Sequence, residues 1–224
     1  MVNKTLQSQV AKAGVASRAG ASYPHLMRAI INSVKLLWLV LALPGLVLLH
    51  GWWNGTVLTM DMLHPTGETS ARLMIAAMLI GPLAGLLGPR RWLLWLLARR
   101  RALGVAAFGY AAAHLAFYII DMGSLQAVLG ELPIASIWTG WLALALMLPM
   151  ALTSNQAAMK RLRAAWKRVQ QLAYPAAVLT LLHWWWVHDG AAAALVHFVP
   201  LVLAWLLLAL RKNFTPKPSP QAGV

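Results

Sequence analysis

Three histidines lie deep inside long apolar segments of the chain: His114, His183 and His197. Each stands five to seven residues from the nearest polar end of its segment, which corresponds to roughly 8 to 10 Å at a helical rise of about 1.5 Å per residue. These segments are long enough to cross a membrane, where ionisable side chains are costly and usually functional. The three histidines therefore form one predicted tier in the outer half of a bilayer.

Two neutral imidazoles that face each other from different helices can ligate the iron of a six-coordinate b-type haem. The run at 104–113, just before His114, is rich in Gly and Ala. It leaves space for close helix packing or for a flat macrocycle. Intramembrane histidines also serve in proton relays and in hydrogen bonds between helices. Spacing alone leaves all three interpretations open.

Six stretches without Asp, Glu, Lys or Arg must position these histidines: 36–60, 73–89, 102–120, 132–159, 169–187 and 190–210. A transmembrane helix needs about 20 apolar residues, with a range of roughly 17 to 25, and each stretch meets this length. The sequence therefore predicts an all-α integral membrane protein built as a bundle of six transmembrane helices.

The charged residues predict the orientation of this bundle. The five acids fall at 51–70, 121–131 and 188–190, and the basic residues fall before residue 36, at 90–101, at 160–168 and after residue 210. Because cytoplasmic loops carry the excess of Lys and Arg, both termini are predicted to be cytoplasmic and the acidic loops to face outside. Only Arg72 breaks the pattern.

The composition favours a membrane protein over a soluble one. Hydrophobic residues make up 60% of the chain, charged residues 11%, and the mean hydropathy is +0.66. The net charge of +14 is divided among short loops, so we attribute it to orientation and to anionic lipid rather than to nucleic acid. The absence of Cys excludes disulfides, thiolate metal sites and iron–sulfur clusters.

Three regions are expected along the chain. Residues 1–33 are basic and lack the apolar core of a secretory signal, which predicts a flexible cytoplasmic extension. Residues 34–212 form the predicted six-helix transmembrane domain. Residues 213–224 carry three prolines and are expected to be a flexible tail.

Several short motifs, in order, resemble those of a known family. They are the segment from Asp61 through His64 to Gly67, Arg100-Arg101 with Gly104, His114 through Tyr118, Thr153 to Gln156, Trp166 four residues before Gln170, and Tyr174 nine residues before His183. From about residue 61 to residue 211 the chain resembles the MsrQ (YedZ) family. Its members are haem-binding membrane subunits of the periplasmic methionine sulfoxide reductase system, within the ferric-reductase-like transmembrane domains.

The resemblance implies a multi-pass cytochrome b of the bacterial inner membrane. Such a subunit takes electrons from the quinone pool or a cytoplasmic flavin and passes them to a periplasmic molybdenum-cofactor sulfoxide reductase. It is an electron-transfer subunit rather than a stand-alone enzyme, and no catalytic residue is expected.

The resemblance implies different roles for the individual histidines. It implies that His114 and His183 are the axial ligands of the haem. His64 matches a family histidine in the expected outer loop, where it lines the haem edge or the docking surface, or merely caps the second helix. His197 matches no family position, so we expect it to have a packing or supporting role.

One departure from the family pattern bears on the number of haems. A histidine is expected thirteen residues before the one matching His183, but this chain has Gln170 there, and Arg100 and Arg101 stand at the equivalent distance before His114. Neither Gln nor Arg is a good ligand for haem iron, so we expect one haem b. Arg100 and Arg101 could instead hold a flavin phosphate such as that of FMN, and Gln170 a quinone carbonyl.

Two alternatives differ from an electron-transfer protein. One is a haem-free transporter in which the histidines relay protons, although the apolar stretches hold few other polar residues. The other is a degenerate family member that serves as a non-redox scaffold.

Overall fold

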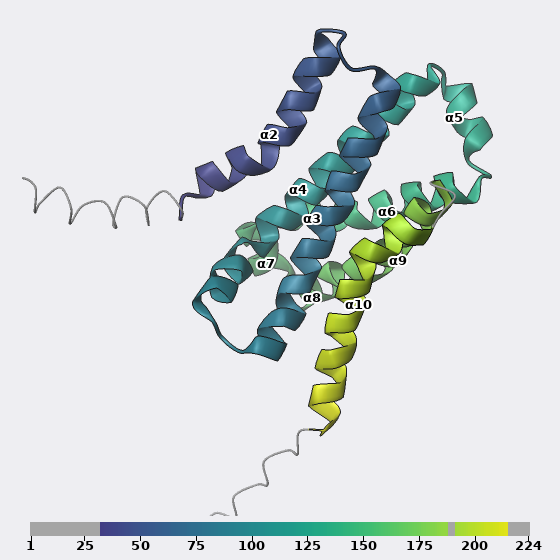
Figure 1. Ribbon diagram of the computed structural model, residues 1–224. Helices are drawn as coiled ribbons and strands as arrows, with labels where there is room; N and C mark the ends of the chain where they lie inside the picture. The colour runs from purple at the N-terminus through teal and green to yellow at the C-terminus, as the bar shows by residue number, and fades with distance from the viewer. Residues whose placement is uncertain (1–31, 188–190, 215–224) are drawn as a thin grey trace, which may run out of the picture. The chain divides into compact units, whose positions relative to one another are not determined.

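The structure, a computed structural model, describes residues 32–187 and 191–214. Within these ranges every regular element is an α-helix (Figure 1). In chain order they are α2 (Val34–Trp53), α3 (Thr59–Leu87), α4 (Arg91–Met122), α5 (Leu125–Glu131), α6 (Ala135–Leu152), α7 (Gln156–Leu162), α8 (Ala164–Gln170), α9 (Ala173–Val187) and α10 (Ala191–Phe214).

The chain divides into two compact units, Met1–Pro44 and Gly45–Val224. The described part of the first unit is residues 32–44, whose helical residues are the first, apolar half of α2. The second unit holds the remainder of α2 and all the other helices, including every residue of the candidate site below.

In the part of the chain that the structure describes, five helices are long and apolar enough to cross a membrane: α2, α3, α4, α6 and α10. The predicted all-α membrane class is therefore confirmed. The stretch 169–187, expected to be one continuous span, is interrupted because α8 ends at Gln170 and α9 begins at Ala173. The 15 residues of α9 rise about 22 Å, which is less than a hydrocarbon core of about 30 Å.

The start of α3 differs from the sequence prediction. This helix begins at Thr59 instead of near residue 73. His64 consequently lies on the helix, and its expected place in an outer loop is wrong. Charged residues in this segment predict a loop, but Glu68 and Arg72 pair one turn apart on α3, and Pro65 is tolerated within the helix.

Helix pairs build the core of the second unit. The most extensive contacts join α3 to α4 and α6 to α9, and α10 packs against α3. Small side chains lie at these interfaces, since Ala107 and Ala176 have no exposed surface, and small residues let helix backbones approach closely. The Ser70 hydroxyl also donates a 2.8 Å hydrogen bond to the carbonyl oxygen of Ala107, joining α3 to α4.

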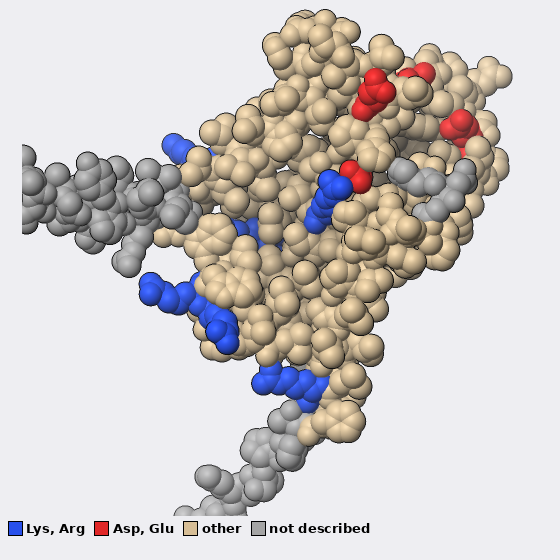
Figure 2. Space-filling view, viewed as in Figure 1, with Lys and Arg blue, Asp and Glu red and all other residues tan. Residues whose placement is uncertain are grey.

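Charge within the second unit is distributed as the sequence suggested. In Figure 2 the Asp and Glu side chains gather at one end of this face, and basic side chains lie toward the opposite end. Arg72 remains the exception, and its guanidinium lies 3.0 Å from the Glu68 carboxylate. The one basic residue that breaks the charge pattern is therefore neutralised by a partner on its own helix.

Candidate functional site

Two of the three predicted histidines face each other across the bundle. His114 extends from α4 and His183 from α9. Their ring centroids are 6.0 Å apart, and the ring planes are nearly perpendicular, at 82°. Residues 69 positions apart in sequence thus form one pair of imidazoles.

Backbone carbonyl oxygens fix the tautomer of both imidazole rings. The Nδ1 of His114 lies 2.9 Å from the carbonyl oxygen of Leu63 on α3, and the Nδ1 of His183 lies 2.5 Å from that of Ser136 on α6. A carbonyl oxygen only accepts, so each Nδ1 carries the proton and each Nε2 is the basic nitrogen. This is the arrangement by which proteins orient metal-ligating histidines.

A cavity of about 450 Å³ surrounds the histidine pair. Residues of α3, α4, α6 and α9 line it, and most of them are apolar, including Leu63, Ala111, Leu144 and Met147. Its volume falls within the range of about 300 to 1,000 Å³ typical of small-molecule sites. The site is therefore an apolar chamber with two imidazoles and few other polar groups.

The donor set of this chamber fits a haem. Two histidine nitrogens that bind one metal ion from opposite sides lie about 4 Å apart. Adding the distance from each nitrogen to the centre of its ring gives roughly 6 Å between the two ring centroids. The observed distance between the centroids of His114 and His183 is 6.0 Å. Among the described residues no group of three or more His, Asp and Glu side chains gathers to hold an ion. A porphyrin supplies the four remaining nitrogens itself.

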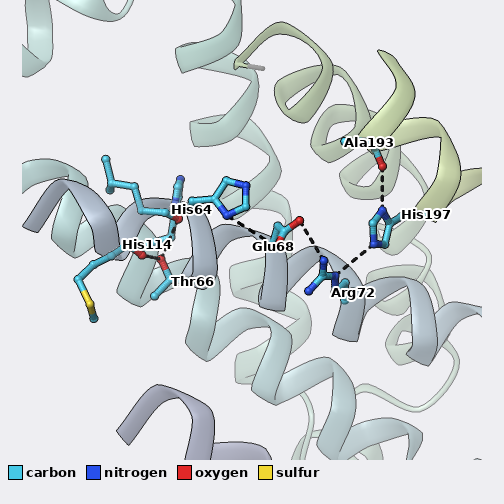
Figure 3. Close-up of polar contacts among 9 residues, drawn as sticks. His64, Thr66, Glu68, Arg72, His114, Ala193 and His197 are labelled. Atoms are coloured by element: carbon cyan, nitrogen blue, oxygen red, sulfur yellow. Dashed lines mark hydrogen bonds and ion pairs between the residues drawn. The ribbon is translucent and has the colours of Figure 1, made fainter. Parts of the chain in front are cut away.

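A chain of polar contacts runs from the edge of this cavity to α10 (Figure 3). His64 and Glu68 line the cavity, and the His64 Nδ1 lies 3.7 Å from a Glu68 oxygen. Glu68 accepts a 3.0 Å hydrogen bond from Arg72, whose Nε donates to the Nε2 of His197 at 3.2 Å. Glu68 is not among the predicted site residues, although the exceptional position of Arg72 in the charge pattern is a signal for an acidic partner.

His197 lies apart from the other two histidines. Its Nδ1 is 2.8 Å from the carbonyl oxygen of Ala193, and its ring lies over Trp184 with centroids 5.0 Å apart. It is not among the residues that line the cavity. Its contacts connect α10 to α3 and α9, next to the histidine pair.

A second cavity, of about 670 Å³, lies between the basic ends of the helices. Its polar lining includes Arg100, Arg101, Lys167, Gln170 and Gln171, and its aromatic lining includes Trp166, Tyr174 and Trp205. The Nε2 of Gln170 donates to the carbonyl oxygen of Met150 and to the hydroxyl of Thr153, both at 3.2 Å. Gln170 thus ties α8 to the end of α6, and no histidine lines this cavity.

Comparison with known proteins places the chain in a class of membrane proteins. Residues 66–181, more than half of the chain, match the family described as ferric reductase like transmembrane component. No solved structure matches the chain.

Curated relatives narrow the class. The chain is 35% identical over 166 residues to the protein-methionine-sulfoxide reductase heme-binding subunit MsrQ of Xanthomonas oryzae pv. oryzae (strain MAFF 311018), a match covering 70% of this chain and 74% of that protein. The subunit of the same name from Deinococcus radiodurans is 33% identical over 161 residues, covering 67% and 76%. The chain belongs to the MsrQ family, and the resemblance inferred from short motifs is confirmed.

Proposed function

We propose that the chain is a membrane electron-transfer subunit that binds one haem b between His114 and His183. The single observation that carries this proposal is the facing pair of imidazoles, 6.0 Å apart, in an apolar cavity. The curated relatives are named as haem-binding subunits, which agrees with this donor set. The protein passes electrons without transforming a substrate of its own.

The surrounding residues set the conditions for a bound haem, which supplies a one-electron carrier. The two Nε2 atoms would ligate the iron, and the two backbone carbonyls hold the ring tautomers. Apolar side chains such as Leu144 and Met147 line the site and would limit the access of water. The low dielectric and the two histidines would together tune the redox potential of a bound haem.

In this proposal the chain spans the bacterial inner membrane six times with both termini in the cytoplasm. The sixth span in this count is α9 (Ala173–Val187), beside the five longer apolar helices. The histidine pair then lies in the outer half of the bilayer, close to the acidic surface. This position suits transfer to a periplasmic partner, which the relatives' names indicate is a methionine sulfoxide reductase and which we take to carry a molybdenum cofactor.

The proposal is tested by a dithionite-reduced-minus-oxidised visible spectrum of the purified protein with haem quantified per chain. We expect the bands of a low-spin b haem at a stoichiometry close to one, since Gln170 replaces the inner histidine of the family pattern. A stoichiometry of two would disprove the single-site assignment. A protein that takes up no haem during overproduction with added haem precursor would favour the transporter or scaffold alternative.

The second cavity, between the basic ends of the helices, is the proposed binding site of the electron donor, a quinol or a reduced flavin such as FMN. Its cations suit a phosphate, and Gln171 can donate to a quinone carbonyl. Trp205 also lines this cavity, and its indole Nε1 is buried without a hydrogen-bond partner among the described residues.

Replacing Arg100, Arg101 and Lys167 together by Ala is expected to leave haem content unchanged. Because a charge-assisted hydrogen bond contributes about 1.5 to 3 kcal/mol, the loss should weaken the flavin or anionic donor at least about tenfold. The measurement is the rate of haem reduction against donor concentration in stopped flow.

The matched control for this variant replaces Lys160, Arg161 and Arg168, exposed cations that do not line the cavity. This control removes the same charge from the same side of the protein. Equal slowing in both triple variants would assign the effect to surface charge and contradict the proposed donor site.

A further inference from the structure

Each histidine of the pair lies on a glycine of the neighbouring helix. A Cβ added at Gly140 on α6 would come within 2.8 Å of both Nδ1 and Cε1 of His183. A Cβ added at Gly67 on α3 would come within 3.1 Å of the Nδ1 and 3.2 Å of the Cε1 of His114. The same edge of each imidazole therefore occupies the space that a side chain would fill.

The glycines and the accepting carbonyls share one helical register. His114 donates to Leu63 and lies on Gly67, and His183 donates to Ser136 and lies on Gly140. In both helices the glycine is four residues after the acceptor. The two contacts repeat the same construction in the two helix pairs with the most extensive contacts, α3 with α4 and α6 with α9.

Helix geometry explains why this register requires glycine. The Cα–Cβ bond of a helical residue tilts toward the N-terminus, so a side chain covers the turn that precedes it. The carbonyl of residue i, already bonded to the N–H of residue i+4, has a second lone pair that the side chain of residue i+4 would shield. In this protein a threonine hydroxyl at i+3 also donates to each carbonyl, Thr66 to Leu63 at 3.1 Å and Thr139 to Ser136 at 3.0 Å. A glycine at i+4 leaves that lone pair accessible to an incoming imidazole.

We infer that Gly67 and Gly140 are positioning residues that hold the two axial imidazole planes close to perpendicular. The inference rests on the proposed haem ligation by His114 and His183. Each glycine with its accepting carbonyl is called a glycine seat: Leu63 with Gly67 on α3, and Ser136 with Gly140 on α6. These two seats together set the observed interplanar angle of 82°. Partners that fix the ring orientation of a metal-ligating histidine tune the metal, so these glycines control the electronic state of the iron.

The orientation of the planes has a spectroscopic signature. Perpendicular axial imidazoles leave two d orbitals of low-spin ferric iron nearly equal in energy, which gives a strongly anisotropic electron paramagnetic resonance signal with one large g value. Parallel imidazoles separate those orbitals and give a rhombic signal. The unmodified, haem-loaded protein is therefore expected to show the strongly anisotropic signal, and a rhombic one would overturn the inference.

The variants for the test are Gly140→Ala and Gly67→Ala in the full-length chain. For Gly140→Ala we expect a rhombic or heterogeneous signal and haem affinity about tenfold lower, as for other losses of a ligand-orienting contact. Gly67→Ala should change both in the same direction but less, since its contacts are 3.1 Å rather than 2.8 Å. It also serves as the second variant if Gly140→Ala does not fold.

Gly109→Ala is the matched control. Gly109 lies on α4, and a Cβ there meets nothing within 4 Å. Ala is favoured over Gly in a helix, so the control should keep the wild-type signal, haem affinity and stability. Wild-type signals in both seat variants would overturn the inference while leaving haem binding intact. Absence of haem from the unmodified protein would instead overturn the proposed function.

Discussion

We expect the replacement of His114 or His183 by Ala to remove haem from the purified protein. In the proposed site each histidine would provide one of the two protein ligands, and Ala offers no donor atom in its place. Loss of a contact that only orients a ligand costs about 10- to 100-fold in metal affinity, so loss of the ligand itself should cost at least about 100-fold. We expect both variants to lack the low-spin spectrum, with haem content close to background.

The measurement is haem per chain by pyridine haemochrome assay, together with the reduced spectrum. His197→Ala is the matched control, because it removes an imidazole from the same tier that does not line the cavity. It should retain haem at the wild-type ratio. Retention of a low-spin haem in either His114→Ala or His183→Ala would reject the assigned ligand pair.

Much of this site could be predicted from one-dimensional patterns. Apolar segment length and the alternation of acidic with basic residues are constraints that a bilayer imposes directly on sequence. They predict His114 and His183 at one depth in the bilayer. Two ionisable residues at equal depth in a small bundle have few places to lie other than opposite each other.

The glycine seats could not be predicted from the sequence. Their recognition requires knowing that α3 packs on α4 and α6 on α9, and at which register. Gly67 and Gly140 are unremarkable among 16 glycines in the chain. Backbone acceptors are still less visible, because every residue has a carbonyl and only tertiary contact selects those of Leu63 and Ser136.

The predicted start of α3 is wrong for a different reason. The prediction assumes that charged residues mark a loop, whereas α3 begins at Thr59 and contains both Glu68 and Arg72. The same assumption hides the contact between these two side chains. A charged residue is compatible with a continuous helix when a partner one turn away neutralises it. Arg72 is an exception to the charge pattern in the sequence, and Glu68, four residues earlier, is the acid that can pair with it on a helix.

That contact leads to a stability prediction. Glu68→Ala should lower the free energy of unfolding by about 2 kcal/mol. This estimate lies between the weak contribution of an exposed ion pair and the cost of placing an unpaired Arg in a bilayer. The Glu68 side chain is only 18% exposed, and without it the guanidinium retains its hydrogen bond to neutral His197 but no counter-charge.

The asymmetry between the two partners makes the prediction specific. Arg72→Ala should cost less, because Glu68 then keeps a contact with His64 at 3.7 Å. The double variant should be more stable than Glu68→Ala alone, since it no longer contains the unpaired cation. Denaturant titrations in one detergent, followed by circular dichroism, give the double-mutant cycle, and coupling of about 1 kcal/mol or more is expected for residues in one network. Simple additivity of the two substitutions would show that Arg72 does not depend on Glu68, and the exception in the charge pattern would then need another explanation.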